Sequence, residues 1–539
     1  MRRITSLVTA AAVIASGAAA VGSAAAAPAP SAQAPVTQAR GGGTYTPPSV
    51  RWGTCANSRL ADAGAECGKV LVPLDYAKPR GQKIAIAVSR IKAKKGTRYL
   101  GPMLVNPGGP GGSGLTLARL GAWVPDNAGD GYDWIGFDPR GVGDSEPSLS
   151  CDGNYTEPVR PAIIPRTASI ERAWRDKAAV YAKDCRKNNG AILNHLRSDN
   201  TVRDMDSIRA ALGSKKISLY GFSYGTYIGQ GYASRYPSHV YRFVLDGVVD
   251  ASRAWYPANQ DQNAAFENSM REWFAWIAKN DATFGLGTKP SVVRQRWFEI
   301  RNELAKKPRG KVGSSEWTDV FLSAGYYVYD WVHLGQLYSQ AAQGDFAGVE
   351  DEYLTSNPTG PGADNGYAVY LGVQCTDARW PTQWNRWRQD AWRQHRTAPF
   401  ETWGNTWFNL PCLNWPAPQG NPTKMNGAKA PAMLLIAETK DAATPFSGAL
   451  ATRHRFPRSV LIEGVGGTTH SGSLSGVACT DNRVAAFLKD GILPKRRSGN
   501  RADVQCDPVP QPDPNVGLRR SAPTGNPELR ELLQQAQGL

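Results

Sequence analysis

The sequence predicts an α/β fold in which a mostly parallel sheet, covered by helices on both faces, is interrupted by an inserted helical cap. Three observations lead to this prediction. Residues 51–250 alternate between strand-like and helix-like runs, the order that builds a parallel sheet. Residues 251–428 are helix-like and rich in tryptophan, and strand-like runs resume over residues 429–507.

The length and composition of the chain agree with a core in two parts and a separate insert. A chain of 539 residues is longer than a single hydrophobic core usually supports, which is about 250–300 residues. Hydrophobic residues make up 41% and charged residues 20%, as in a folded globular protein. We therefore expect core segments at 51–250 and 429–507, a cap at 251–428 and a tail at 508–539.

The first 27 residues have the features of a secretory signal peptide. Two arginines precede an apolar stretch over residues 4–21, and small residues follow up to Ala27, a pattern that signal peptidase cleaves. Residues 28–50 are rich in Ala, Pro, Gly and Gln, so we expect a propeptide or linker there. No later apolar run approaches the roughly 20 residues that cross a bilayer. We therefore expect a secreted, extracellular protein without membrane insertion.

The eight cysteines agree with export, because disulfides persist in oxidising compartments. Many pairings are open to eight cysteines, and the spacing along the chain favours local bonds. The favoured bonds are Cys55–Cys67, Cys151–Cys185, Cys375–Cys412 and Cys479–Cys506. Neither CxxC nor HExxH occurs in the sequence, so we expect no metal site.

The formal net charge of +16 raises the question of a nucleic-acid partner. The lysines and arginines are spread along the chain, with no run of five or more. This distribution is typical of a solvated surface, so we expect no nucleic-acid binding. The sequence leaves the oligomeric state open, and we take a monomer as the expectation.

Apolar runs predict the strands of the core. They lie at Val70–Pro73, Ile84–Ile91, Met103–Val105, Trp134–Phe137, Ile217–Tyr220, Phe243–Leu245, Ala432–Ala437 and Val460–Ile462. Core helices are predicted at Thr201–Leu212, Thr226–Tyr236 and Asn482–Lys489.

Tryptophan marks the predicted cap. Residues 251–428 contain 13 of the 17 tryptophans. Many of them recur every three to five residues, which is typical of amphipathic helices that pack around an aromatic core.

The strongest motif is Gly221-Phe222-Ser223-Tyr224-Gly225, a G-x-S-x-G between an apolar strand and a helix. In that context the serine is held on a sharp turn that exposes its hydroxyl. The flanking glycines allow backbone to pass where a Cβ would clash. We therefore predict that Ser223 is a nucleophile.

A serine hydroxyl is a weak nucleophile, so the motif requires a base and an acid that orients the base. With this strand–turn–helix arrangement, the chain order is serine, acid, histidine. His470 follows the last predicted strand and is the predicted base. Asp441 follows the strand before it and is the predicted acid, with Asp246 and Glu438 as rivals.

A glycine-rich loop over residues 106–114, NPGGPGGSG, follows another strand. It contains the spacing G-x-G-x-x-G, but its prolines remove donors and constrain the turn, so we expect no dinucleotide or other cofactor. In hydrolases this position supplies an oxyanion donor. We predict the backbone amides of Gly109 and Tyr224 as the donors, with Gly108 as the alternative to Gly109.

With these residues in place, the chain resembles the secreted tripeptidyl aminopeptidases, which are related to the prolyl aminopeptidases. The resemblance rests on NPGGPGGSG at 106–114, GFDPRGVG at 136–143, SYGTY at 223–227, CTDARWP at 375–381 and DAATP at 441–445. It implies an α/β-hydrolase core with a helical cap. It also implies Ser223 as nucleophile, Asp441 as acid and His470 as base.

The resemblance further implies release of tripeptides from free N-termini through an acyl-enzyme. Such an enzyme must bind the α-ammonium group of its substrate, which calls for a carboxylate in a partly closed pocket. Glu267 and Asp377 in the predicted cap are the candidates. Prolyl or dipeptidyl specificity, a carboxylesterase with the same triad, and an inactive binding module remain as alternatives.

Overall fold

The structure is a computed structural model that describes residues 45–515 and 528–529. The predicted signal peptide (1–27), residues 28–44 of the predicted linker and most of the predicted tail (508–539) lie outside the described residues.

Ten strands form one sheet in the order β1-β2-β3-β5-β4-β6-β7-β8-β9-β10. The strands from β5 to β10 in this order pair in parallel, whereas β1, β2 and β3 pair antiparallel, as do β3 and β5. The prediction of a mostly parallel sheet is therefore confirmed. The strands are β1 Gly53–Thr54, β2 Glu66–Pro73, β3 Lys83–Ile91, β4 Gly101–Asn106, β5 Tyr132–Phe137, β6 Ile217–Phe222, β7 Val240–Asp246, β8 Leu434–Glu438, β9 Val460–Gly464 and β10 Val504–Cys506.

Every apolar run predicted as a strand overlaps one of β2 to β9, and the central strands are buried along their whole length. Burial on both faces explains why these runs are continuously apolar. The helices outside the insert are α1 Ser58–Asp62, α2 Ala168–Asn189, α3 Ser198–Ala211, α4 Tyr224–Arg235, α14 Phe446–Arg455 and α15 Ala478–Asp490.

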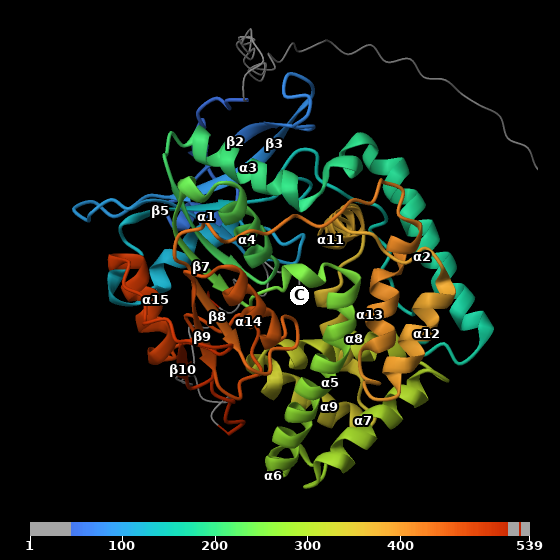
Figure 1. The fold of residues 1–539 in the computed structure, drawn as a ribbon. Coiled ribbons are helices and arrows are strands. Elements are labelled where there is room, and N and C mark those ends of the chain that lie inside the picture. Colours follow the sequence, from blue (N-terminus) through green and yellow to red (C-terminus); the bar gives the residue numbers. More distant parts are fainter. Residues whose placement is uncertain (1–44, 516–527, 530–539) are drawn as a thin grey trace, which may run out of the picture. The chain divides into compact units, whose positions relative to one another are not determined.

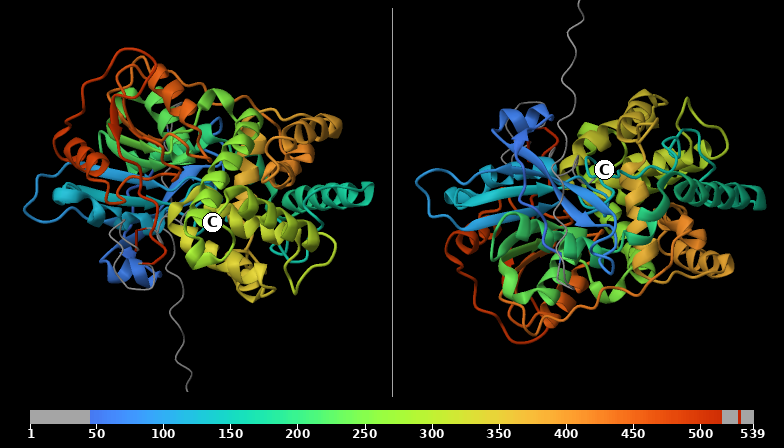
Figure 2. Two further views of the ribbon diagram at one scale, coloured as in Figure 1. Left: turned by 90° about the horizontal axis from the view of Figure 1, so that it is seen from below. Right: turned by 90° about the horizontal axis from the view of Figure 1, so that it is seen from above.

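Between β7 and β8 the chain forms the helices that we call the cap. Figure 1 shows them gathered on one side of the sheet, and the two views of Figure 2 agree. The cap helices are α5 Tyr256–Lys279, α6 Asp281–Phe284, α7 Pro290–Leu304, α8 Ser314–Tyr326, α9 Trp331–Ala342, α10 Ala347–Ser356, α11 Asn365–Asp377, α12 Trp384–His395 and α13 Thr402–Asn409.

Tryptophans form the centre of the cap, which confirms the interpretation of their spacing. Trp273, Trp297, Trp317 and Trp331 are all completely buried in one hydrophobic cluster. The rings of Trp297 and Trp317 lie 5.7 Å apart. Aromatic pairs at this separation add to the stabilisation that burial alone gives.

Helix α2 belongs to the first part of the chain but packs against the cap. The ring of Trp174 stacks on that of Trp407 at 5.5 Å, and Trp384 donates a hydrogen bond to Glu171 (2.6 Å). Figures 1 and 2 show α2 beside α12 and α13. The predicted boundary at residue 250 assigns α2 to the core, so it did not predict this contact with the cap.

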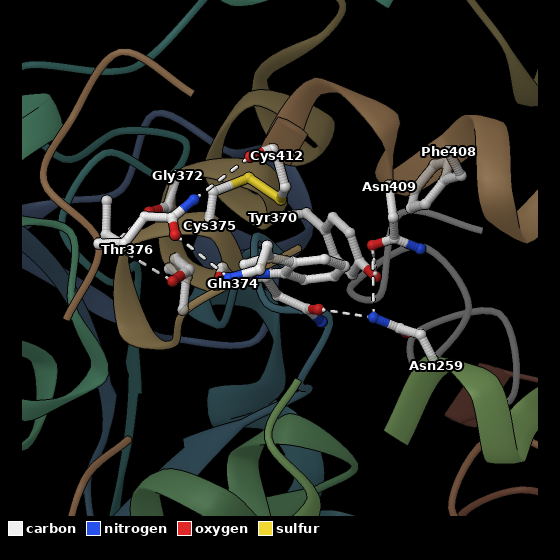
Figure 3. Close-up of a disulfide and its surroundings, with 12 residues drawn as sticks. Asn259, Tyr370, Gly372, Gln374, Cys375, Thr376, Phe408, Asn409 and Cys412 are labelled. Carbon is white, nitrogen blue, oxygen red and sulfur yellow. Dashed lines mark hydrogen bonds between the residues drawn. A yellow bond between two sulfur atoms is a disulfide. The ribbon is translucent and has the colours of Figure 1, made fainter. Parts of the chain in front are cut away.

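Four disulfides join cysteines that are neighbours along the chain: Cys55–Cys67, Cys151–Cys185, Cys375–Cys412 and Cys479–Cys506. These are the pairs that the spacing favours, and the described residues include no free cysteine. The bond between Cys375 and Cys412 links the end of α11 to η7 (Leu410–Asn414), directly after α13 (Figure 3). Across residues 45–515, no helix has both the length and the apolar character needed to span a bilayer.

Candidate active site

Ser223 occupies the turn between β6 and α4. Its φ of 53° and ψ of −124° lie in a region that side-chain-bearing residues rarely adopt. The flanking glycines are needed for close approach. A Cβ on Gly221 would lie 2.7 Å from the carbonyl oxygen of Gly225, and one on Gly225 would lie 2.7 Å from that of Asn106. The turn leaves Ser223 half-buried while its neighbours are buried.

Hydrogen bonds hold the backbone of this turn on both sides. The Ser223 amide donates to the carbonyl of Asp246 at the end of β7 (2.9 Å). The amide and hydroxyl of Thr226 both donate to the Ser223 carbonyl, at 2.8 and 2.7 Å. The strained conformation is thus fixed by neighbouring structure, which pre-positions the side chain.

Asp441 and His470 meet at the ends of β8 and β9. The Nδ1 atom of His470 lies 2.8 Å from Oδ2 of Asp441, and both side chains are buried. The Thr444 hydroxyl donates to the same Oδ2 (2.8 Å), while the amides of Ala443 and Thr444 donate to Oδ1. An ionised carboxylate accepts hydrogen bonds and cannot donate one. Nδ1 therefore carries the proton, and Nε2 is the basic nitrogen of the ring.

His470 Nε2 is buried and has no hydrogen-bond partner among the described residues. The Ser223 hydroxyl does not donate to it in this structure, and such bonds are often formed only with substrate bound. Both residues nevertheless adjoin the end of β7. Ser223 bonds to Asp246, and a Cβ on the next residue, Gly247, would lie 2.8 Å from Cε1 of His470.

The cap supports the loop that carries His470. The carbonyl of Tyr326, at the end of α8, accepts the His470 amide (2.8 Å). The rings of these two residues meet edge to face, with centroids 5.8 Å apart. The Val328 amide also donates to the Thr469 hydroxyl (3.4 Å). The orientation of the imidazole therefore depends on both the core and the cap.

The two rival acids do not touch the imidazole. Asp246 uses Oδ2 to accept the Ser473 amide (2.8 Å). Glu438 accepts the amides of Thr469 and Val509, both at 2.6 Å. Burial raises the pKa of Asp246 to about 6 and that of Glu438 to about 8. Both carboxylates bind the backbone around His470 rather than its ring.

The glycine-rich loop packs directly against the serine turn. Gly108 has a φ of 105°, and a Cβ there would lie 2.7 Å from the Cβ of Ser223 and 3.0 Å from the amide nitrogen of Tyr224. The Gly108 amide donates to the Asn106 side chain (3.1 Å), so this alternative donor is already engaged. The amides of Gly109 and Tyr224 have no hydrogen-bond acceptor among the described residues, so both are free to donate to a ligand.

The DPRG turn after β5 stabilises that loop. Asp138 accepts the Ser113 hydroxyl (2.6 Å) and the Gly114 amide (3.0 Å). Arg140 forms a two-pronged ion pair with Asp204, with both contacts at 2.7 Å and both side chains buried. These contacts hold the loop in place without reaching the serine.

Glu267 does not face an open site. Its Oε1 accepts Arg294 (2.8 Å) and lies 3.1 Å from Arg271. Its Oε2 accepts the Phe400 amide (3.2 Å). Both oxygens of the buried Glu267 thus have partners within the protein, and its role as the ammonium-binding group stays a prediction.

Asp377 is committed in the same way. Oδ1 accepts the Ser198 amide (2.8 Å), and Oδ2 accepts the Ser198 hydroxyl and the Trp255 indole N–H. The side chain is completely buried. Asp377 thus joins α11 to the start of α3, and its role as an ammonium-binding group stays a prediction.

The structure contains a different buried carboxylate, which no motif in the sequence marks. Glu401 precedes α13 and is only 8% exposed. Its carboxylate makes no hydrogen bond or ion pair with the described residues. Burial, followed by the negative charge of Asp319, raises its pKa well above the usual range, whereas the positive charges of Arg301 and Arg160 act to lower it. Burial, followed by the negative charges of Glu401 and Asp441, raises the pKa of Tyr326. Tyr326 therefore lies within electrostatic range of both Glu401 and the Asp441–His470 pair.

A network of amide side chains fixes α13 relative to α5 and α11. Asn259 donates to Gln374 (3.1 Å) and to Asn409 (3.4 Å), and the Tyr370 hydroxyl donates to Asn409 (3.0 Å). Figure 3 shows these side chains beside the disulfide of Cys375. The helix that follows Glu401 is thus held by hydrogen bonds and by a covalent bond at its far end.

The described residues contain no cluster of three or more His, Cys, Asp or Glu side chains that could hold a metal ion.

Comparisons with known proteins identify the family of the chain. A family model described as alpha/beta hydrolase fold matches residues 101–474. The tripeptidyl aminopeptidase of Streptomyces coelicolor is 40% identical over 481 residues, which cover 86% of this chain and 87% of that protein. Serine protease Hip1 of Mycobacterium bovis is 30% identical over 83% of this chain and 89% of its own length. Carboxylesterase B of Mycobacterium tuberculosis is 30% identical over 84% and 90%.

The family match covers more than half of the chain, and the three relatives cover 83–86% of it. The sheet and the serine turn are typical of this family, and two of the relatives are named as peptidases. The chain therefore belongs to the α/β hydrolase family, as a serine peptidase related to the tripeptidyl aminopeptidases.

Proposed function

We propose that this protein is a secreted serine exopeptidase that releases short peptides from free N-termini, and that the released peptides are tripeptides. The observation that carries the proposal is that Ser223, on a strained turn, and the hydrogen-bonded pair Asp441–His470 both adjoin the end of β7. Nucleophile, acid and base follow the parallel strands β6, β8 and β9, at the edge of the sheet where ligands bind in this fold.

In the acylation step, Ser223 Oγ attacks the carbonyl carbon of the scissile bond as His470 Nε2 takes the hydroxyl proton. The amides of Gly109 and Tyr224 donate to the oxyanion that forms. His470 then gives its proton to the leaving amine, the C–N bond breaks, and an ester to Ser223 remains. Asp441 stabilises the imidazolium throughout.

Deacylation repeats these roles with water as the nucleophile. His470 Nε2 takes a proton from the water as its oxygen attacks the ester carbon. The proton is returned to Ser223 Oγ when the ester bond breaks, which releases the N-terminal fragment with a free carboxylate.

An exopeptidase must also recognise the α-ammonium group, and we assign this role to Glu401. A buried carboxylate without a partner is unfavourable, and a substrate ammonium would supply the missing partner as a charge-assisted hydrogen bond. An extended chain advances about 3.3–3.6 Å per residue. An anchored N-terminus would therefore fix how many residues precede the bond at Ser223.

Glu267 and Arg301 bind the backbone of the two residues that precede Glu401. Glu267 accepts the Phe400 amide (3.2 Å), and Arg301 donates to the carbonyls of Pro399 (3.1 Å) and Phe400 (3.0 Å). In this arrangement Glu267 supports the anchor instead of forming it.

Secretion fits the covalent chemistry of the chain. All eight cysteines form disulfides, and such bonds persist in extracellular proteins. Together with the predicted signal peptide, the four disulfides support export of the protein.

The decisive test is mass spectrometry of the products from matched peptides with free and acetylated N-termini. We expect the wild type to release tripeptides from free peptides only, and Ser223→Ala to release none. Glu401→Gln should lower kcat/KM for free peptides by about 10–100-fold, as loss of a hydrogen bond to a charged group does. Glu303→Gln, which changes an exposed glutamate of α7, should leave kcat/KM unchanged.

Cleavage of acetylated peptides at internal bonds would contradict the exopeptidase assignment. Release of single residues or dipeptides would instead indicate prolyl or dipeptidyl specificity. Failure of a fluorophosphonate to label Ser223 would indicate an inactive binding module.

A carboxylesterase is the second candidate, because a relative at 30% identity carries that name and the same three residues can hydrolyse esters. Acyl esters have no ammonium group. An esterase should therefore turn over p-nitrophenyl esters more efficiently than free peptides, and Glu401→Gln should not affect it.

A further inference from the structure

Asp246, the last residue of β7, carries a buried oxygen atom with no partner. The side chain is completely buried. Its Oδ2 accepts the Ser473 amide (2.8 Å), whereas Oδ1 has no hydrogen-bond partner among the described residues. Buried carboxylate oxygens are normally hydrogen-bonded, because loss of hydration is costly. The free oxygen therefore needs an explanation.

Two other buried carboxylates bind the same loop, and neither has a free oxygen. Asp481 accepts the amides of Leu474 and Gly476, both at 2.7 Å and on separate oxygens. Glu438 likewise uses one oxygen for each of its two amides. Holding the loop therefore does not by itself require a free oxygen, and Asp246 differs from the other two.

Asp246 lies between the nucleophile and the base. Its carbonyl accepts the Ser223 amide (2.9 Å) and the Ser471 hydroxyl (3.4 Å). A Cβ on the adjacent Gly247 would lie 2.8 Å from Cε1 and 3.2 Å from Nδ1 of His470. The end of β7 is thus packed against the imidazole ring itself.

Among the ionisable groups around Asp246, one can carry a positive charge. Burial is the main cause that raises its pKa to about 6. Hydrogen bonds with Ser473, followed by a positive charge on His470, lower this pKa, and the negative charge of Asp441 raises it. Glu438 and Tyr220 also face Asp246, and both are acids.

Tyr326 and Tyr327 face the other side of the imidazole. The group that can carry positive charge in this cluster is therefore the imidazole of His470. It becomes positive when it takes the serine proton.

We propose that Asp246 is a positioning residue whose free carboxylate oxygen stabilises the imidazolium form of His470 through space. Two carboxylates then set the basicity of the ring, Asp441 by a hydrogen bond and Asp246 by its charge alone. The inference rests on His470 being the catalytic base, but it does not depend on the substrate being a peptide.

The test is the pH dependence of kcat/KM for Asp246→Asn, measured with a small p-nitrophenyl ester. Asparagine keeps an acceptor for the Ser473 amide and removes the charge. Without that charge the imidazolium is less favourable, so the acid limb should move to lower pH by about half a unit to one unit, up to a tenfold change in that equilibrium. At pH 7 kcat should fall while KM for the ester stays the same.

Asp481→Asn is the matched control. Asp481 binds the same loop through two amides, so this variant should lose stability without moving the acid limb. An acid limb that stays in place in Asp246→Asn would overturn the proposal. So would an equal displacement in both variants, because the effect would then act through the loop.

The test stays informative even if Asp246→Asn folds poorly. An apparent pKa does not depend on the concentration of active enzyme, so a poorly folding Asp246→Asn still reports its acid limb. Asp246→Ser, which keeps a small acceptor, should move the limb in the same direction. Ester turnover also separates the two proposals, since an enzyme that ignores N-termini would still show the displaced limb. Activity retained by His470→Ala would contradict both.

Discussion

The chemistry proposed for Ser223 depends on a few close contacts around one strained residue. Gly108, Gly221 and Gly225 all lie where a Cβ would come within 2.7 Å of a neighbouring atom. The Asp441–His470 pair is equally constrained, since four hydrogen bonds to Asp441 hold the ring by its Nδ1 atom. Pre-positioned groups of this kind lower the reorganisation that a reaction requires.

Asp441→Asn should reduce kcat by about 10⁴-fold, because an amide stabilises the wrong tautomer of the imidazole and cannot balance its charge. Active-site titration with a fluorophosphonate and near-ultraviolet circular dichroism would show whether the fold survives. A variant that folds and keeps more than a tenth of wild-type kcat would indicate that another group, such as Glu438, orients His470.

Gly108→Ala should abolish most activity, by about 10²–10³-fold, if the oxyanion site lies between Gly109 and Tyr224. The new Cβ would lie 2.7 Å from Ser223 Cβ, and the backbone φ of 105° is unfavourable for alanine. Gly96→Ala is a matched control, because Gly96 has a φ of 84° and nothing within 4 Å of the added Cβ. Equal losses of activity in the two variants would mean that strain, and not the position beside Ser223, is responsible.

The binding of free N-termini should strengthen as the pH rises if Glu401 is the anchor. Burial raises the pKa of Glu401, so the free enzyme holds this carboxyl protonated at acidic pH. A bound ammonium favours the ionised form, so binding releases a proton and KM should fall with increasing pH. Above about pH 8 the peptide amine itself deprotonates, and KM should rise again. A pH series of KM for one tripeptide-releasing substrate checks this, and Glu401→Gln should lose the acidic side of the dependence.

At the scale of helices and strands, local patterns predicted the core well. The continuous apolar runs of β4 and β6 are buried on both faces, so hydrophobicity alone marks them, and the G-x-S-x-G motif specifies its own turn. The short edge strands β1 and β10 have two and three residues, too few to produce a pattern. Glu401 could not be recognised, because a glutamate before a helix is an ordinary sequence. What distinguishes it is burial without a partner, which depends on tertiary structure.

The disulfide Cys375–Cys412 should matter for substrate binding as well as stability. It closes a loop with a sequence separation of 37, so a Cys375→Ser, Cys412→Ser variant should lose about 3–4 kcal/mol of unfolding free energy. Because the bond fixes the end of α13, KM for free peptides should rise more than KM for esters. Urea denaturation and the two KM values check this.

Removal of Cys55–Cys67 provides the comparison for that variant. Its sequence separation is 12, so the loss of stability should be slightly smaller. This bond lies at the β1 edge of the sheet, so the ratio of the two KM values should stay the same. A changed ratio in this variant would contradict a specific role for the α13 disulfide.

At the scale of the whole molecule, the loop that carries His470 joins the core to the cap. Carboxylates from β7, β8 and α15 bind its backbone, and the carbonyl at the end of α8 accepts the His470 amide. Helix α2 adds a second connection between the two parts. The sequence could not predict either connection, since each depends on residues far apart along the chain.

These buried carboxylates should make global stability fall as the pH rises. Glu438 has a folded-state pKa of about 8, raised from 4.5 by burial, and Asp246 and Asp481 each have one of about 6. A raised folded pKa means that the folded state binds more protons than the unfolded state, so the stability from this source is complete below about pH 4 and is lost as the pH passes through 6 to 8. Calorimetric Tm values between pH 5 and pH 8 should therefore decrease. In Glu438→Gln this decrease should be smaller, even if Tm is lower throughout, because a neutral side chain has no proton to lose. A variant whose Tm falls as steeply as that of the wild type would show that Glu438 is already ionised in the folded protein.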